Sequence, residues 1–129
     1  MKFLLDTNAV IALLKAHPGF RDRLQRHPPK DFAIPSIVAH ELFYGAYKSQ
    51  NVAANLARVE GLRLEILDFD SEDAQCAGEI RARLAKAGTP IGPLDALIAG
   101  QALVRSLTLI THNRREFDRV EGLAVEDWL

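Results

Sequence analysis

The chain has 129 residues, of which 48% are hydrophobic and 26% are charged, and its formal net charge is −1. This composition is that of a globular protein with one sizeable core, and it excludes intrinsic disorder and a membrane-embedded fold. The near-zero net charge excludes a general attraction to nucleic acid, so any phosphate-binding surface must be local.

Two features bear on the cellular compartment. The single Cys76 cannot form an intramolecular disulfide, which fits a reducing cytoplasm. The residues after Met1 are similar to the start of a signal peptide, but the apolar run is interrupted at Asp6 after three residues. We therefore expect a cytoplasmic protein with no membrane segment, organised as a single domain over residues 1–129.

The first half of the chain alternates apolar runs with helical patterns. Thr7 or Asn8 is the expected cap of the first helix, and Ser36 is the expected cap of the third. The apolar positions of that third helix, Tyr44 among them, cover more than one face, so we expect it to be buried. Strands are expected at residues 3–5 and 31–34, and helices at residues 9–16, 20–26, 37–48 and 53–59.

The second half continues this alternation. The acidic residues 70–73 are typical of a helix start, and Ala74, Ala77, Ile80 and Leu84 are the expected inward positions of that helix. Strands are expected at residues 64–67, 107–110 and 123–125, helices at residues 70–86 and 94–105, and a polar loop at residues 111–115. Apolar strands that alternate with helices favour parallel pairing. The predicted fold class is α/β, a three-layer αβα sandwich around a mainly parallel sheet of four to five strands.

Asp6 and Asp95 are candidate site residues. Asp6 follows the first strand, and open α/β sheets place their ligands at the carboxyl ends of strands. Asp95 lies among apolar neighbours, where an unpaired carboxylate is costly. Each also has a structural interpretation: Asp6 as a helix cap, and Asp95 in the first turn after Pro93, where it complements the helix dipole.

Glu41 lies in the expected buried helix, which again makes an unpaired charge costly. The alternative is a surface glutamate on a polar stripe with Lys48. His40 and Glu41 are similar to the start of a zinc-protease helix, but position 44 is Tyr44 rather than a second histidine, so that zinc site is excluded.

Polar residues follow the strand at residues 107–110. Thr111 is suited to hydrogen-bond a phosphate or a metal-bound water, and Arg114 or Arg115 to hold a phosphate; a solvated loop is the alternative. If the three acids and this segment meet at one sheet edge, they form a site for Mg²⁺ or Mn²⁺, which prefer carboxylate and water oxygens. Such a site suits hydrolysis of a phosphodiester.

The whole chain resembles the PIN-domain ribonucleases and, within them, the VapC toxins of bacterial type II toxin–antitoxin pairs. The segments that carry the resemblance are residues 5–8, 41–45, 91–99, 111–117 and 120–128.

The resemblance implies a magnesium-dependent endoribonuclease that is inhibited by a cognate VapB-type antitoxin. It also implies a homodimer, and binding to operator DNA jointly with the antitoxin. Cleavage of initiator tRNA in its anticodon stem-loop is the expected activity, and the antitoxin tail is expected to lie over the acidic cleft. By position, Asp6, Glu41 and Asp95 would be the catalytic and metal-binding acids, and Thr7, Asn8 and Thr111 supporting polar residues.

The chain departs from many PIN domains at Asn113, where they carry a fourth acid. Glu116 is the expected substitute, or a second metal binds weakly. Three alternative functions are a non-catalytic metal-binding signalling module, another metal-dependent phosphatase, and an RNA- or protein-binding module that has lost catalysis. The phosphatase is disfavoured because it would normally carry a second aspartate two residues after the first, where this chain has Asn8. The sequence leaves open the cleavage position and the choice between one and two metal ions.

Overall fold

The computed structural model describes residues 1–129 and contains one parallel sheet in the order β3-β2-β1-β4-β5. The strands are β1 (Phe3–Leu5), β2 (Phe32–Pro35), β3 (Glu65–Leu67), β4 (Thr108–Ile110) and β5 (Val125–Glu126). The helices are α1 (Thr7–Leu14), α2 (Pro18–Leu24), α3 (Ser36–Lys48), α4 (Val52–Glu60), α5 (Ser71–Lys86), α6 (Pro93–Val104) and α7 (Arg114–Phe117), with a 3₁₀ turn at Pro29–Asp31. The predicted fold class is confirmed.

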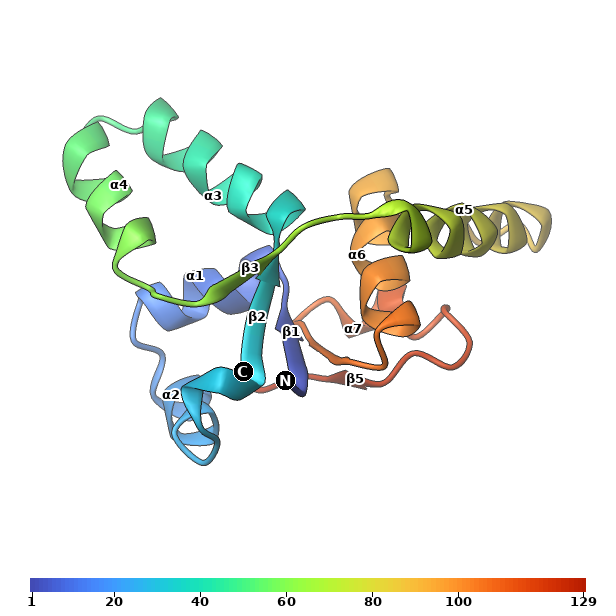
Figure 1. The fold of residues 1–129 in the computed structure, drawn as a ribbon, viewed down its shortest axis with the longest axis horizontal. Helices are drawn as coiled ribbons and strands as arrows, with labels where there is room; N and C mark the ends of the chain where they lie inside the picture. The colour runs from blue at the N-terminus through green and yellow to red at the C-terminus, as the bar shows by residue number, and fades with distance from the viewer.

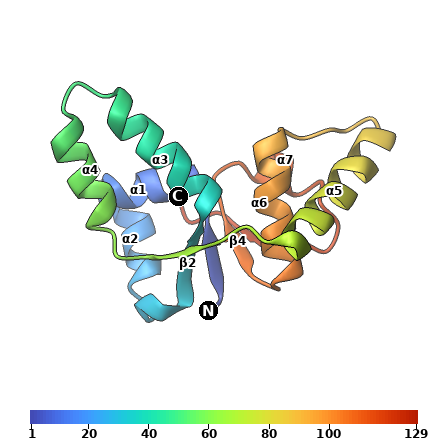
Figure 2. The same cartoon turned by 45° about the horizontal axis from the view of Figure 1, so that its top comes forward.

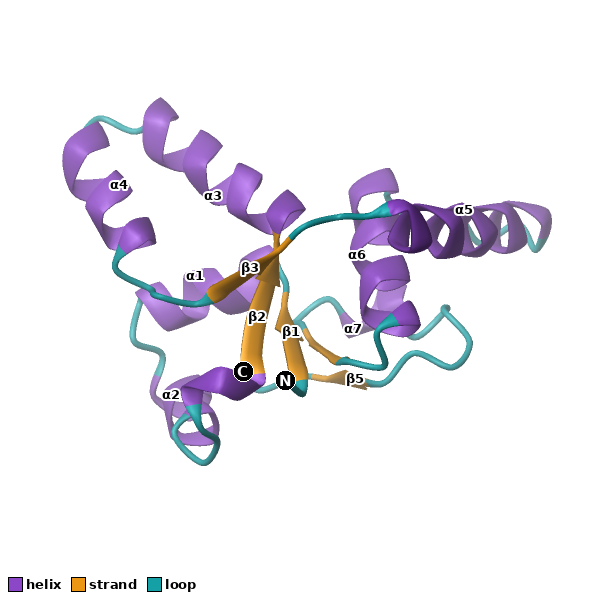
Figure 3. Cartoon of the chain, in the orientation of Figure 1, coloured by secondary structure: helices purple, strands orange, loops and turns teal.

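The strand order reverses direction at β1. The chain runs outward from β1 to β2 and β3, and then returns to place β4 on the other side of β1. Helices α1 to α4 lie to one side of the molecule and α5 and α6 to the other, with the short strands between them (Figures 1, 2 and 3). Ligands of such sheets bind where the strand order reverses, so the carboxyl ends of β1 and β4 mark the expected site.

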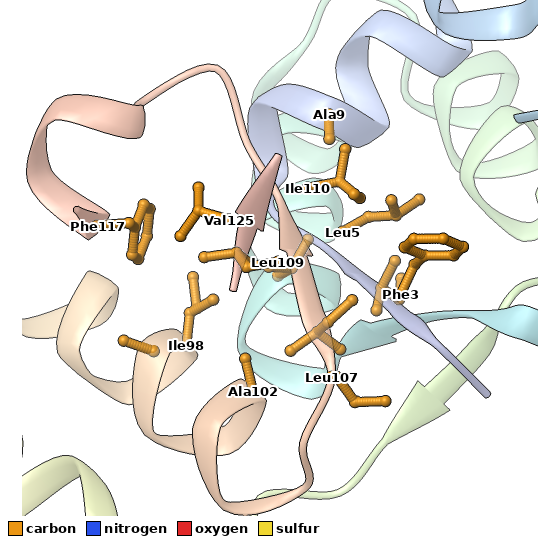
Figure 4. Close-up of a cluster of buried hydrophobic side chains, with 14 of the residues drawn as sticks. Phe3, Leu5, Ala9, Ile98, Ala102, Leu107, Leu109, Ile110, Phe117 and Val125 are labelled. Carbon is orange, nitrogen blue, oxygen red and sulfur yellow. The ribbon is translucent and has the colours of Figure 1, made fainter. Parts of the chain in front are cut away.

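The core fills both faces of the sheet because the central strands are apolar on both sides. Leu4, Leu5, Leu109 and Ile110 are at most 1% exposed. In Figure 4, Leu109 points toward Ile98 of α6, whereas Leu5 and Ile110 lie on the side of α1. None of the helices is both long and apolar enough to cross a membrane.

Several local predictions are wrong, and helix capping explains two of them. Asp6, rather than Thr7 or Asn8, caps α1, because its extended backbone lets its side chain accept the amide of Ala9. Ser36 is the first residue of α3 and makes no capping bond, since Pro35 occupies the cap position.

Other differences concern exposure. Tyr44 is 60% exposed, because α3 buries only the stripe that contains Val38 and Leu42. Ala74 is exposed, and the neighbouring Asp73 points inward in its place. The expected loop at residues 111–115 is shorter than predicted, since α7 begins at Arg114.

Candidate active site

Asp6 and Thr111 meet where the strand order reverses. Asp6 directly follows β1, Thr111 directly follows β4, and the two strands pair in parallel with Leu5 opposite Ile110. Both residues are almost fully buried, and the Thr111 hydroxyl donates a hydrogen bond to Asp6 Oδ2. The backbone amide of Ala9 donates to Asp6 Oδ1 at 2.9 Å. The carboxylate is thus fixed through both of its oxygens.

Glu41 approaches the same edge from α3. Thr7 Oγ1, in the first turn of α1, donates to Glu41 Oε1 at 3.0 Å. The side chain of Glu41 is half-buried, because it lies near the middle of α3 with the buried Leu42 beside it. Thr7 and Asp6 are adjacent in the chain, so this hydrogen bond ties the glutamate to the end of β1.

Asp95 and Glu116 form a carboxyl pair on the other side of the site. Asp95 lies in the first turn of α6, which begins with Pro93, and Glu116 lies in α7. A hydrogen bond joins the two carboxyl groups, raising the pKa of Asp95 and lowering the pKa of Glu116. Asn113 Nδ2 donates to Glu116 Oε2 at 3.2 Å and holds that carboxylate toward Asp95.

The pKa values show that these acids influence one another. Burial raises the pKa of Asp95 to about 7, aided by the bond to Glu116 and by the charges of Glu116, Asp6 and Glu41. Burial also raises the pKa of Asp6, against the hydrogen bonds from Thr111 and Ala9, and the charge of Glu41 adds to the rise. The three predicted acids therefore lie within electrostatic reach of one another.

The remaining predicted residues lie around this cluster. The backbone amide of Asn113 donates to Thr111 Oγ1 at 2.9 Å, which fixes the hydroxyl that holds Asp6. The side chain of Asn8 is exposed, but its backbone amide lies against Asp6. Arg114 is exposed and pairs at 3.2 Å with Asp118, the C-cap residue of α7, so its charge is partly neutralised.

The donor set suits a hard divalent cation. Asp6, Glu41, Asp95 and Glu116 make no salt bridge with any lysine or arginine. A divalent ion would relieve the repulsion that, after burial, adds to the raised pKa values of Asp6 and Asp95. Oxygen ligands are those that Mg²⁺ and Mn²⁺ prefer. No three acidic, histidine or cysteine side chains form a ready-made cage. An ion here would take part of its shell from water, as Mg²⁺ commonly does.

Two of these contacts were not among the predictions made from the sequence. The Thr7–Glu41 hydrogen bond joins residues 34 positions apart, and no local pattern signals it. The Asn113–Glu116 bond could have been found, because the two residues are spaced i, i+3 at the start of a helix.

Comparison with known proteins gives consistent matches over the whole chain. Residues 3–123 match the family model described as the PIN domain. The tRNA(fMet)-specific endonuclease VapC of Salmonella typhimurium is 47% identical over 99% of this chain and 98% of its own length. Ribonuclease VapC2 of Haemophilus influenzae is 39% identical over 100% of this chain and 99% of its own length.

Two solved structures have the same fold. The DNA-bound VapBC of Salmonella typhimurium superposes with a TM-score of 0.94 at 47% identity, covering 100% of this chain and 99% of the other. VapBC2 of Rickettsia felis, bound to a DNA fragment from its promoter, gives a TM-score of 0.91 at 36% identity with complete coverage of both chains.

Proposed function

This chain belongs to the PIN-domain family, and we propose that it is the endoribonuclease toxin of a VapBC-type pair that cleaves initiator tRNA. The meeting of Asp6, Glu41 and Asp95 at the reversal of strand order carries the proposal. The activities of the relatives, a tRNA(fMet)-specific endonuclease and the ribonuclease VapC2, support the substrate class.

The partners follow from the same relatives. A VapB-type antitoxin neutralises the enzyme, and the pair binds operator DNA, in line with the DNA-bound VapBC complexes. We further propose that residues 1–129 form one domain, that the protein is a homodimer, and that it acts in the cytoplasm, where its tRNA substrate is found.

The proposed site contains acids that bind the metal ion and threonines that hold those acids in place. Asp6, Asp95 and Glu41 hold a divalent metal ion, for which we propose Mg²⁺, with Mn²⁺ as a substitute. When bound, the ion offsets the charge that develops on the phosphoryl group and provides a nucleophile from water. Thr111 fixes Asp6, and Thr7 fixes Glu41, as the outer residues of metal sites commonly do.

Glu116 takes the place of the fourth acid that many PIN domains carry. Its carboxylate lies beside Asp95 and shares a proton with it near neutral pH. Asp95 would hold a cation in its ionised form, so metal binding would be linked to the loss of this proton from the pair. Asn113 keeps Glu116 in position without adding charge.

The test is cleavage of initiator tRNA with Mg²⁺, followed by mapping of the new RNA ends. The parent protein is expected to cut in the anticodon stem-loop, and removal of the metal with a chelator is expected to stop cleavage. Asp95→Asn is expected to lower the rate about 10²- to 10³-fold, since several kcal/mol of transition-state stabilisation depend on the metal.

Asp22→Asn is the matched control, because Asp22 is an exposed acid of α2 with no hydrogen bond or salt bridge. It is expected to retain the parent rate. Cleavage by a folded Asp95→Asn protein at the parent rate would overturn the catalytic assignment. Cleavage of other RNAs but not of initiator tRNA would overturn the substrate assignment alone.

A further inference from the structure

A groove of about 230 Å³ extends from the acidic site between α1, α3 and α4. Thr7 and Glu41, which belong to the site, line one part of it, and Lys15 and Arg58 also line it. The groove therefore connects one of the proposed catalytic acids, Glu41, to two basic side chains along a lining that is otherwise mostly apolar. Because α1 rises about 1.5 Å per residue, the backbone of Lys15 lies about 12 Å along the helix from that of Thr7.

The two basic residues are not neutralised within the protein. Lys15 and Arg58 are both exposed, and neither forms a salt bridge. The guanidinium of Arg58 donates one hydrogen bond, to the carbonyl of Leu14 at 3.1 Å, which positions it at the end of α1. Its other N–H groups remain available to an anion.

Gly45 also lines the groove and lies one turn beyond Glu41 in α3. A Cβ atom built at this position would meet no other atom within 4 Å. The protein itself therefore does not require a glycine here for lack of space, although glycine weakens a helix interior by about 1 kcal/mol relative to alanine. A ligand that runs along α3 would make use of the missing side chain.

We propose that this groove binds the RNA strand on one side of the scissile phosphate, with Lys15 and Arg58 contacting backbone phosphates. The inference rests on the proposed ribonuclease function and extends it to a substrate-binding subsite. Charge favours RNA as the occupant. The catalytic acids repel a polyanion and the net charge of the chain is −1, so nearby unpaired cations must provide the attraction.

Binding is tested in an Asp95→Asn background, so that no cleavage is needed. The probe is the anticodon stem-loop of initiator tRNA, and its dissociation constant is measured as a function of salt concentration. Lys15→Gln is expected to weaken binding several-fold and to reduce the slope of log K against log salt by about 0.7, the loss of one phosphate contact on a single strand. Lys15→Arg is expected to restore both values.

Lys86→Gln is the matched control, since Lys86 is an exposed and unpaired lysine at the end of α5, outside this groove. It is expected to leave the affinity and the slope unchanged. If Lys15→Gln and Arg58→Gln both retain the parent affinity and slope, the groove does not contact RNA and the inference is overturned.

Filling the groove with a larger side chain provides an independent test of RNA binding. Gly45→Leu, in the catalytically competent protein, is expected to raise KM for the same RNA about tenfold or more while the free energy of unfolding stays the same or increases. Gly78→Leu is the control, because Gly78 lies within α5 and also has open space around its Cβ position. It is expected to leave KM unchanged.

Two further outcomes separate this inference from the proposed function. If Gly45→Leu retains its KM but escapes inhibition by an antitoxin, the groove belongs to a protein partner and the inference is overturned. If the parent binds RNA with the expected lysine dependence but never cleaves it, the groove is supported and the proposed function is overturned.

Discussion

Two clusters of carboxylates, one around Asp73 and one around Asp6 and Asp95, are stabilised in opposite ways. Asp73, at the start of α5, is fully buried and accepts hydrogen bonds from the guanidinium of Arg105 at 3.1 and 2.9 Å and from Gln101 at 3.0 Å. Burial alone would raise the pKa of Asp73, but these bonds outweigh it and the pKa is lowered. Asp6 and Asp95 have no cationic partner, and burial raises the pKa of both.

This difference separates an acid held by its counter-charge from the acids of the proposed metal site. The Asp73 cluster joins α5 to α6, which pack so closely that a Cβ at Gly100 would lie 2.6 Å from the backbone nitrogen of Ala77. Asp95 lies on the same α6, so the fully paired acid fixes the helix that carries the unpaired one. A buried carboxylate that the protein leaves without a counter-charge is free to bind a cation from solution.

The largest expected effect comes from removing the partner of Asp73. Arg105→Met leaves the Asp73 carboxylate buried without its cation, which is expected to lower the free energy of unfolding by about 3–5 kcal/mol. Urea denaturation measures the change. Arg83→Met is the control, since Arg83 forms an exposed pair with Glu79 in α5 and should change stability by less than about 0.5 kcal/mol. If the two variants lowered the free energy of unfolding by similar amounts, the Asp73–Arg105 pair would not be a special stabilising contact, and its contrast with the unpaired acids would be lost.

In the cluster that contains Asp95, ionisation of the carboxyl group is expected to lower the stability of the fold instead of raising it. The folded-state pKa of Asp95, about 7, lies above its ordinary value of 3.8, so ionisation of Asp95 opposes folding. The free energy of unfolding of the metal-free protein is expected to fall as pH rises from about 4 to about 7 and to change little above that. Asp95→Asn removes the contribution of Asp95 to this fall, leaving that of Asp6, and is expected to stabilise the protein by on the order of 1–2 kcal/mol at pH 8.

Thermal unfolding in a chelator at several pH values measures this effect. Addition of Mg²⁺ is expected to stabilise the parent at pH 8 and to have little effect on Asp95→Asn, because only the parent keeps the ligand. A parent protein whose stability is flat between pH 4 and 7 would contradict the assignment of a repelled carboxyl at residue 95.

Thr111→Val affects both stability and activity, but less strongly. The variant loses the hydroxyl that donates to Asp6 and accepts from the amide of Asn113. The expected costs are about 1 kcal/mol of stability and a 10- to 100-fold loss of cleavage rate, the usual effect of removing an outer residue of a metal site. Thr111→Ser, which keeps the hydroxyl, is expected to recover most of both, and a failure to do so would show that the methyl group matters instead.

Much of this site was predictable because its signals are local. The apolar run that ends at Asp6 predicts a strand and a polar end, and the sheet then brings Asp6 to Thr111 through the pairing of β1 with β4. Strand boundaries were off by no more than one residue for β1, β2, β3 and β4, since short apolar runs define them closely.

The rest depends on contacts that only the folded chain makes. In the sequence, Asp73 is one of several acids at a helix start, and nothing local indicates that Arg105, 32 positions away, would pair with it and neutralise its charge. The exposure of Tyr44 was missed for the same reason, because an apolar residue on a helix is buried only if another element covers that face.

The smallest expected effect concerns Asn113, where this chain lacks the fourth acid of many PIN domains. Asn113→Asp replaces the donor that holds Glu116 with a charge beside it. Repulsion is expected to lower the metal-free stability by less than about 1 kcal/mol. The added oxygen ligand is expected to increase Mn²⁺ affinity severalfold in calorimetry. Asn51→Asp is the control, since Asn51 caps α4 away from the site and aspartate caps as well. A second bound ion in Asn113→Asp alone would mean that Asn113 limits the parent to one, whereas an unchanged isotherm would mean that Glu116 already supplies the missing ligand.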